Sequence, residues 1–187
     1  MKKIAVFASG NGSNFQRIVE YFENKDNIEI SLLVVNKKDA FARERAKDLG
    51  IEHIYIDREE FYNSNTLLDI LKGKDINLIV LAGFLWLIPE YLIDNYTIIN
   101  IHPALLPKYG GKGMYGDKVH NAVIENKEKE SGITIHYVNN KYDKGEVIFQ
   151  AKCEILPFDD ANSLAEKIHA LEHEYFPQII EKLISES

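Results

Sequence analysis

Asn100 and His102 stand two residues apart in NIHPALLPKYGG, residues 100 to 111. On a strand, side chains at this spacing point to the same face of the sheet. An amide that donates to a carbonyl oxygen, beside an imidazole that can exchange a proton, is the combination that acyl transfer requires. A lone histidine beside a proline is more often structural, so this pair by itself leaves both interpretations open.

Asp143 lies in NNKYDKGEVI, a polar stretch that predicts a turn in which Gly145 allows a tight bend. An aspartate at this place is usually only a turn former. If the fold brings Asp143 close to His102, the carboxylate favours the imidazolium and raises the pKa of His102. The spacing in the sequence leaves that contact open.

The segment SGNGSN, residues 9 to 14, has the composition of a strand-to-helix turn whose backbone N–H groups can face a phosphate. A tight turn without a ligand is the alternative. A dinucleotide site fits less well, because Phe15 stands where a small third residue is needed. In addition, the second strand ends at Asn36 and Lys37, so the acidic residue that binds the ribose in a dinucleotide site is missing there.

Metal binding has little support in the sequence. His169 and His173 are one helical turn apart and could share a metal, but no third ligand lies at a suitable spacing. Cys153 is the only cysteine, which excludes an intrachain disulfide and fits a reducing compartment. We therefore expect no metal, and we interpret the remaining histidines as structural or surface residues: His53, His120 and His136.

The strands and helices that position these residues are predicted from the pattern of apolar residues along the chain. Apolar runs rich in β-branched residues alternate with segments of helical period, which is typical of an α/β fold. We predict a mostly parallel, twisted, Rossmann-like sheet with helices on both faces. The predicted strands cover residues 3–8, 29–35, 52–56, 77–83, 97–101, 132–138 and 146–155.

Helices are predicted from apolar stripes at intervals of three and four residues. The first stripe is Phe15, Ile18, Val19 and Phe22, and the second is Ala42, Ala46 and Leu49, ended by Gly50. Further helices are expected near residues 67–71 and 117–126. The tail from residue 160 is expected to be helical, with Leu164, Ile168, Leu171 and Tyr175 on one stripe and Pro177 bending or breaking the helix.

Length and charge narrow the class of protein. A chain of 187 residues predicts one domain, residues 1–187. The net charge of -7 lacks the basic excess that nucleic acid requires, and no apolar run approaches the roughly 20 residues of a membrane helix. The apolar stretch before Ser9 is too short for a signal peptide. We expect a cytoplasmic protein that acts on small molecules, without nucleic-acid or membrane partners.

Five segments, taken together and in order, resemble the phosphoribosylglycinamide formyltransferase family over nearly the whole chain. They are SGNGSN, VLAGF (residues 80–84), NIHPALLPKYGG, the Asp143 turn and LEHEYFP (residues 171–177). The resemblance implies transfer of a formyl group from 10-formyltetrahydrofolate, as co-substrate, to the glycinamide amine of a ribonucleotide in purine synthesis. It also implies a phosphate-binding half, about residues 1–100, and a folate-binding and catalytic half, about residues 80–187.

The resemblance assigns the catalytic roles to Asn100, His102 and Asp143. Asn100 and a protonated His102 stabilise the oxyanion of the tetrahedral intermediate, and Asp143 keeps His102 charged and helps relay the proton to the leaving folate nitrogen. The ribonucleotide phosphate is assigned to Gly12, Ser13 and Asn14, and its amine end to Glu172. Folate is assigned to Leu85, Trp86, Leu87 and Ile88, together with Asn100 and Asp143.

Departures from the family pattern lie outside the catalytic trio. Trp86 stands where many members carry arginine, and the arginine that some members use for the folate tail has no match near residues 63 to 65. Glu146 and Val147 also replace the usual continuation of the Asp143 turn. The alternatives are a formyltetrahydrofolate hydrolase, a methionyl-tRNA formyltransferase or a catalytically silent nucleotide-sensing module. The oligomeric state stays open between a monomer and a weak homodimer.

Overall fold

The computed structural model describes residues 1–186, which fall into two compact units, residues 1–99 and 100–186. The first unit contains four parallel strands: β1 (Lys2–Ala8), β2 (Ile28–Val35), β3 (His53–Tyr55) and β4 (Ile76–Leu81). β1 pairs with β2 on one side and with β4 on the other. The last five residues of β1 are fully buried, which explains why this strand is a continuous apolar run instead of an alternating one.

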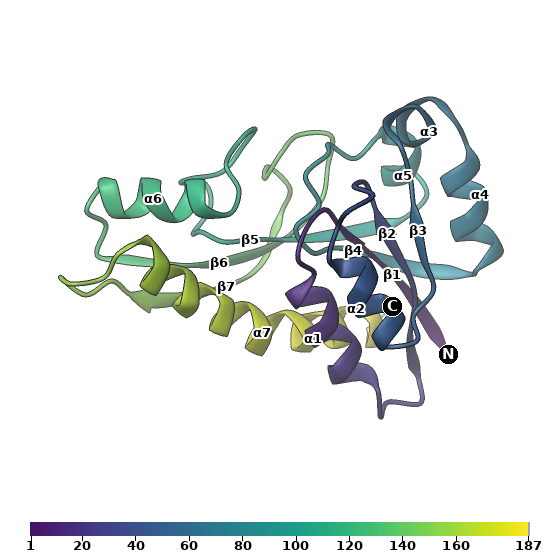
Figure 1. Ribbon diagram of the computed structural model, residues 1–187, viewed down its shortest axis with the longest axis horizontal. Helices are drawn as coiled ribbons and strands as arrows, with labels where there is room; N and C mark the ends of the chain where they lie inside the picture. The colour runs from purple at the N-terminus through teal and green to yellow at the C-terminus, as the bar shows by residue number, and fades with distance from the viewer. Residues whose placement is uncertain (187) are drawn as a thin grey trace. The chain divides into compact units, whose positions relative to one another are not determined.

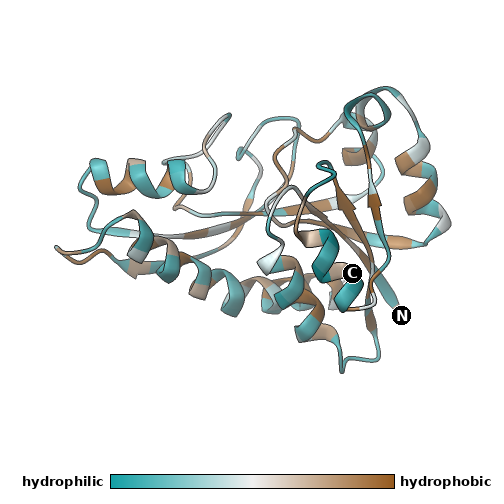
Figure 2. Cartoon of the chain, viewed as in Figure 1, coloured by the Kyte–Doolittle hydropathy of each residue, from teal (hydrophilic) through white to brown (hydrophobic). Residues whose placement is uncertain are grey.

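The helices of the first unit are α1 (Ser13–Phe22), α2 (Ala42–Asp48), α3 (Arg58–Asn63), α4 (Thr66–Gly73) and α5 (Glu90–Ile93). The predicted stripe of α1 is confirmed, since Phe15, Ile18, Val19 and Phe22 are its buried residues. Figure 2 shows this contrast: the strands of the first unit are largely hydrophobic, whereas α1 alternates between hydrophobic and hydrophilic residues. The sequence prediction missed α3 and α5.

The second unit contains α6 (Asp117–Glu125), β6 (Glu130–Tyr137), β7 (Val147–Glu154) and α7 (Ala161–Ser185). β6 and β7 form an antiparallel pair, and the turn between them contains Asp143. α7 begins with a capping box in which Asp160 and Ser163 satisfy each other's backbone N–H groups. Pro177 was predicted to bend or break this helix; a break is wrong, because α7 continues past this residue to Ser185.

β5 (Thr97–His102) contributes residues to both units, and the seven strands are hydrogen-bonded in the order β3-β2-β1-β4-β5-β6-β7 (Figure 1). The predicted fold class is therefore confirmed as an α/β fold with a mostly parallel open sheet. The order in which strands are added to the sheet reverses at β1, because β2 and β3 lie on one side of β1 and β4 on the other, although all four strands are parallel. In open α/β sheets, ligands bind at the carboxyl ends of strands beside such a reversal.

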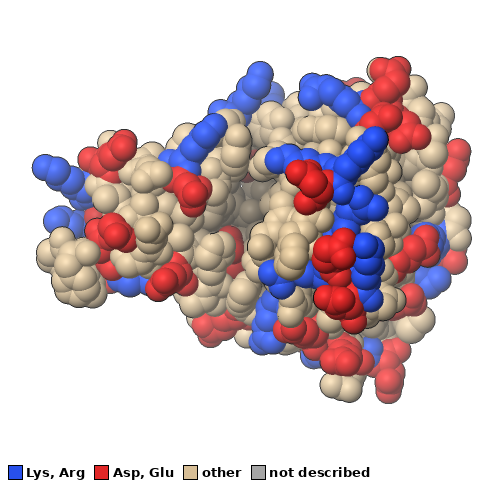
Figure 3. All heavy atoms as spheres, in the orientation of Figure 1, with Lys and Arg blue, Asp and Glu red and all other residues tan. Residues whose placement is uncertain are grey.

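The surface carries both signs of charge. On the face drawn in Figure 3, Lys and Arg side chains are interspersed with Asp and Glu, and no large field of one sign covers that face. No helix within residues 1–186 is both long enough and apolar enough to cross a membrane.

Candidate active site

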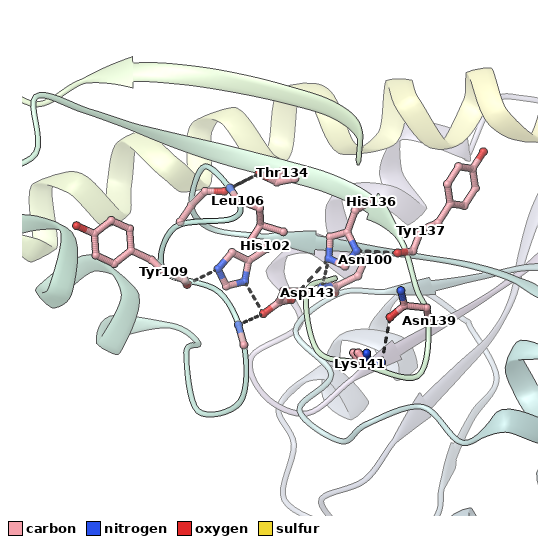
Figure 4. Close-up of polar contacts among 12 residues, drawn as sticks. Asn100, His102, Leu106, Tyr109, Thr134, His136, Tyr137, Asn139, Lys141 and Asp143 are labelled. Atoms are coloured by element: carbon pink, nitrogen blue, oxygen red, sulfur yellow. Dashed lines mark hydrogen bonds and ion pairs between the residues drawn. The ribbon is translucent and has the colours of Figure 1, made fainter. Parts of the chain in front are cut away.

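The fold brings the three predicted catalytic residues of the second unit together (Figure 4). Asn100 and His102 come from the end of β5, and Asp143 comes from the turn between β6 and β7. The Asp143 carboxylate lies 3.5 Å from His102 Nδ1 through Oδ2, which also accepts a hydrogen bond of 2.8 Å from the backbone N–H of Gly111. The contact that the sequence left open is therefore present.

The hydrogen-bond partner of His102 determines which ring nitrogen can titrate. Nε2 lies 2.7 Å from the backbone carbonyl oxygen of Tyr109. A carbonyl oxygen can only accept, so Nε2 carries the hydrogen. The remaining nitrogen, Nδ1, is the atom that gains or loses a proton, and Asp143 stands beside it as the counter-charge when the ring becomes a cation.

His136, on β6, completes this network and was interpreted from the sequence as structural. Its Nδ1 lies 2.8 Å from the backbone carbonyl of Tyr137, so Nδ1 carries the hydrogen and Nε2 can accept from the Asn100 side-chain amide at 3.1 Å. Nε2 also lies 3.6 Å from Asp143 Oδ1. His136 therefore orients the Asn100 amide, whose second N–H stays available for an oxyanion.

Burial changes the expected protonation of His102. The ring is only 3% exposed, and burial lowers the pKa of His102 by more than Asp143 and the Tyr109 carbonyl raise it. The predicted rise of the pKa of His102 is therefore wrong in its net direction, although Asp143 acts in the expected sense. In the protein without substrate, His102 is mainly neutral at pH 7 and can accept a proton at Nδ1.

Asp143 stays ionised despite its partial burial. Burial raises the pKa of the Asp143 carboxyl, but the His136 ring, whose Nε2 lies 3.6 Å from Oδ1, the charge that His102 carries when protonated, and the Gly111 N–H together lower it below its ordinary value. The site therefore pairs a permanent carboxylate with an imidazole whose charge can change.

Two residues at the site have strained backbones. Tyr109, whose carbonyl binds His102, has φ of 56°, and Asp143 has φ of 52°. Non-glycine residues in this left-handed region cost of order 1–3 kcal/mol and persist where the surrounding structure holds them. Next to Asp143, a Cβ on Gly145 would collide with the backbone carbonyl of Tyr137, so only glycine fits there. These backbone constraints hold the Asp143 carboxylate in place.

Glu172 occupies a buried position on α7. It is 6% exposed and lies within a stripe of buried residues at intervals of four: Leu164, Ile168, Glu172, Phe176, Ile180 and Ile184. The predicted stripe was partly wrong, because Leu171 and Tyr175 are only half-buried. His169 Nδ1 lies 3.1 Å from Glu172 Oε2, and this hydrogen bond raises the pKa of His169. In the sequence, Glu172 stands out because it is an acidic residue in line with the apolar residues of this stripe.

The predicted phosphate loop lies in the first unit, between β1 and α1. Gly12, with φ of 78°, is the N-cap residue of α1. Because glycine has no side chain, no N-cap side chain accepts hydrogen bonds from the first N–H groups of α1. A Cβ on Gly12 would stand 2.6 Å from Ala42 Cβ of α2, so the glycine also permits close packing of α2. Ser13 and Asn14 are half-buried in the first turn of α1.

Arg45, on α2, anchors this loop and was missed by the sequence prediction. Its guanidinium donates to the Asn11 carbonyl at 2.9 Å and to the Asn11 side-chain oxygen at 2.8 Å, and it also contacts Gln16. The backbone N–H of Ala42 bonds the Gly10 carbonyl at 3.1 Å. α2 thus fixes the loop and places a positive charge beside it.

The predicted folate segment, Leu85 to Ile88, follows β4 at the same edge of the sheet. The Ser9 hydroxyl accepts a hydrogen bond of 2.9 Å from the Leu85 N–H, and the Ser9 N–H donates to the Gly83 carbonyl at 3.0 Å. The two predicted binding segments of the first unit are therefore joined directly, at the carboxyl ends of β1 and β4. This is the edge at which the reversal of strand order beside β1 favours a ligand.

No group of three or more His, Cys, Asp and Glu side chains within residues 1–186 could hold a metal ion. His120, which is 3% exposed, has no hydrogen-bond partner for Nδ1 within that part of the chain, and burial lowers the pKa of His120. His169 and His173 have ring centres 6.4 Å apart.

Comparison with known proteins shows the family of the chain. The family model described as formyl transferase matches residues 2–180. The phosphoribosylglycinamide formyltransferase of Bacillus subtilis is 37% identical over 191 residues, which covers 98% of this chain and 95% of that protein. The chain belongs to the formyl transferase family.

Further relatives are a plant protein and a solved bacterial structure. The chloroplastic phosphoribosylglycinamide formyltransferase of Arabidopsis thaliana is 38% identical over 99% of this chain, and the chain spans 66% of that protein's length. The crystal structure of glycinamide ribonucleotide transformylase 1 from Geobacillus kaustophilus superposes with a TM-score of 0.88 at 36% identity, covering 98% of both chains. The family predicted from the five segments is thereby confirmed.

Proposed function

We propose that this protein transfers the formyl group of 10-formyltetrahydrofolate to the glycinamide amine of 5'-phosphoribosylglycinamide. The products are N-formylglycinamide ribonucleotide and tetrahydrofolate, in de novo purine synthesis. The observation that carries this proposal is the network of Asn100, His102 and Asp143 in a chain whose relatives of similar length bear the name of this enzyme.

The chemistry proposed for the trio follows from its hydrogen bonds. The substrate amine attacks the formyl carbon, and the second N–H of the Asn100 amide donates to the oxygen that becomes negative. His102 takes the amine's proton at Nδ1, the only ring nitrogen with a free lone pair. The bond between the carbon and the folate nitrogen then breaks, and the proton from His102 passes to that nitrogen.

Asp143 makes this proton transfer possible in a buried place. When His102 becomes a cation, the carboxylate at 3.5 Å offsets the cost of placing that charge where the ring is 3% exposed. The proposed roles differ from those that the family resemblance implies in two respects. His102 begins neutral and acts first as a base, because burial holds its pKa low. Its Nε2–H is held by Tyr109, so the oxyanion relies on Asn100.

Substrate binding is proposed for the two loops and for α7. The uncapped start of α1, with Gly12, Ser13 and Asn14, suits the ribonucleotide phosphate, and the Arg45 charge beside the loop favours an anion. Glu172, buried on α7, suits the amine end as a hydrogen-bond acceptor. Residues 1 to about 100 would thus bind the phosphate, and residues from about 80 to 187 would supply folate binding and catalysis.

Folate binding is proposed for Leu85, Trp86, Leu87 and Ile88, with Asn100 and Asp143 beside the reacting group. The Leu85 N–H already bonds Ser9, and the Leu87 carbonyl accepts from the Tyr62 hydroxyl at 2.9 Å. The pterin contacts must therefore come from other main-chain groups of the segment, while its side chains supply an apolar wall.

The state of assembly and the compartment are further parts of the proposal. We infer a cytoplasmic monomer or weak homodimer that acts on small molecules and has no nucleic-acid or membrane partner. The net charge of -7 and the mixed charges in Figure 3 support this for nucleic acid. Light scattering between about pH 6 and pH 8 would show the mass in solution.

The experiment that tests the function measures tetrahydrofolate release from 10-formyltetrahydrofolate, with and without phosphoribosylglycinamide. Release that depends on the amine and is lost in His102→Ala and Asp143→Asn supports the transferase. Release without the amine indicates a hydrolase. Tight binding of the ribonucleotide without any release indicates a sensing module.

A further inference from the structure

Two acceptors compete for the single N–H hydrogen of the neutral His102 ring (Figure 4). The Tyr109 carbonyl lies 2.7 Å from Nε2, and the Asp143 carboxylate lies 3.5 Å from Nδ1. A carboxylate is the stronger acceptor, because hydrogen bonds to ionised groups are roughly twice as strong as neutral ones. The hydrogen therefore stays on Nε2, and Nδ1 keeps its lone pair, only while the Tyr109 carbonyl remains the closer acceptor.

The position of the Tyr109 carbonyl depends on a disfavoured backbone conformation. Tyr109 has φ of 56°, and a bulky side chain at positive φ is uncommon. The loop is anchored on either side of this residue, since the Leu106 N–H donates to the Thr134 hydroxyl at 3.0 Å and the Gly111 N–H donates to Asp143 at 2.8 Å. The side chain of Tyr109 supplies a further anchor at the strained residue itself.

This anchor is Glu128. The Tyr109 hydroxyl donates a hydrogen bond of 2.9 Å to Glu128 Oε1, and the Lys108 ammonium donates to the same oxygen at 2.9 Å. The bonds from Lys108 and from the Tyr109 hydroxyl hold the pKa of the Glu128 carboxyl below its ordinary value. Glu128 is therefore ionised, and its bond with the phenol is charge-assisted.

The end of α6 fixes the position of Glu128. Lys127, just after the helix, has φ of 54°, and its N–H donates to the Ile124 carbonyl at 2.9 Å. The Glu128 N–H donates to the Val123 carbonyl at 3.3 Å. This pair of bonds is the Schellman pattern, in which a residue in the left-handed conformation ends a helix and satisfies its last carbonyls. The carboxylate thus reaches Tyr109 from a hydrogen-bonded helix end.

A cavity of about 260 Å³ lies beside this contact. Lys108, Tyr109 and Glu128 are among the residues that line it. Side chains that line a cavity lack packing partners on that side, so the hydrogen bond contributes more than packing to the position of the phenol. The cavity also offers room into which the ring can move when the bond is lost.

We propose that Glu128, acting through Tyr109, is a positioning residue that keeps the His102 hydrogen on Nε2 and thereby keeps Nδ1 free to take the proton of the substrate amine. The inference rests on the proposed function, because it takes Nδ1 as the proton acceptor in formyl transfer. When the bond between the hydroxyl and the carboxylate is lost, the Tyr109 carbonyl withdraws from Nε2. Asp143 then becomes the favoured acceptor, and the hydrogen moves to Nδ1.

The tautomer of His102 can be read from long-range proton–nitrogen NMR spectra of protein that contains isotope-labelled histidine. Spectra are recorded without substrate at about pH 8, where the ring is neutral, and the His102 signals are those missing from His102→Ala. The unaltered protein should carry the hydrogen on Nε2. Tyr109→Phe, which removes only the hydroxyl, and Glu128→Ala should both show a large share of the Nδ1–H form. Glu128→Gln, whose amide oxygen still accepts, should keep mainly the Nε2–H form.

Kinetics of formyl transfer supply the second measurement. Tyr109→Phe and Glu128→Ala should lower kcat about three- to thirtyfold, as for loss of one charge-assisted hydrogen bond, with each KM changed less than about twofold. Glu130→Ala is the matched control, because Glu130 lines the same cavity and pairs with Lys152 at 2.7 Å. It should change neither the tautomer nor kcat.

An unchanged tautomer in Tyr109→Phe and Glu128→Ala overturns the proposal, whatever happens to kcat. An equal shift in Glu130→Ala also overturns it, because the effect then comes from the cavity and not from the bond to Tyr109. Circular dichroism checks that each variant is folded, and Tyr109→Phe alone decides the question if Glu128→Ala does not fold. If the tautomer shifts as expected while the unaltered protein transfers no formyl group, the positioning stands and the proposed function fails, which is a distinct result.

Discussion

Replacing Asp143 by asparagine removes one charge from the network and keeps the shape of the side chain. The amide oxygen can still accept from Gly111, so the turn is preserved. What disappears is the attraction between the carboxylate and a protonated His102, whose Nδ1 lies 3.5 Å away. The pKa of His102 then falls further, because the largest contribution that raises it is lost.

The magnitude follows from the distance and the burial. At 3.5 Å and an effective dielectric constant near 20, two unit charges interact by roughly 4–5 kcal/mol. The two side chains are 4% and 10% exposed, so solvent screens the pair little, but relaxation of the site returns part of this energy. We expect the barrier to rise by about 2–4 kcal/mol, which lowers kcat roughly 30- to 1000-fold.

The assay is kcat against pH for the unaltered protein and Asp143→Asn at saturating substrates. The variant should be slower throughout, and its acidic limb should lie at lower pH. Glu125→Gln, which removes an exposed carboxylate at the end of α6, is the control and should retain full activity. A folded Asp143→Asn protein within threefold of the normal kcat would refute the counter-charge role.

Three further predictions concern other parts of the molecule. Arg45→Ala should raise KM for the ribonucleotide several-fold with little change in kcat, because the loop that it anchors loosens; an equal effect in Lys47→Ala would contradict this. Gly145→Ala should lower the free energy of unfolding by about 1–3 kcal/mol in urea, and an unchanged midpoint would remove the steric argument. Burial holds the pKa of His102 and of His120 below 6.5, so the unfolded chain binds more protons below that pH. These two groups make the free energy of unfolding fall from about pH 6.5 to about pH 5, whereas His169, whose pKa is raised, acts in the opposite sense. The profile of His120→Gln should fall less steeply than that of the unaltered protein, and equal slopes would contradict the burial of His120.

The sheet was predictable because its strands are long apolar runs rich in β-branched residues. β1 and β4 lie within a residue or two of their predicted bounds. The helices α3 and α5 were missed because they have six and four residues, too few for a helical period to emerge. The capping box of α3, an aspartate followed three residues later by a glutamate, was the available signal.

The helix through Pro177 shows how tertiary packing overrides a local rule. A proline removes one hydrogen bond inside a helix and usually bends or ends it. Here Pro177 is buried, as are Phe176 and the later residue Ile180, so burial of the helix on both sides of the proline favours its continuation. The sequence shows the proline but not the surface against which the helix packs.

The proximity of the three candidate catalytic residues could be predicted only in part from the sequence, and their electrostatics could not. The spacing of Asn100 and His102 placed them on one face of a strand, while the approach of Asp143 and the part played by His136 depend on how β6 and β7 pair. The low pKa of His102 depends on the burial of its ring, which no local pattern reveals. For that reason the direction of the pKa shift was the error in the prediction.

The most direct test of the central claim follows the formyl group itself. With isotope-labelled 10-formyltetrahydrofolate and phosphoribosylglycinamide, mass spectrometry shows where the labelled carbon goes. The account predicts label on the glycinamide nitrogen of the ribonucleotide, in amounts equal to the tetrahydrofolate formed and lost in His102→Ala. Label recovered only as free formate, or only in unreacted co-substrate, would contradict the account.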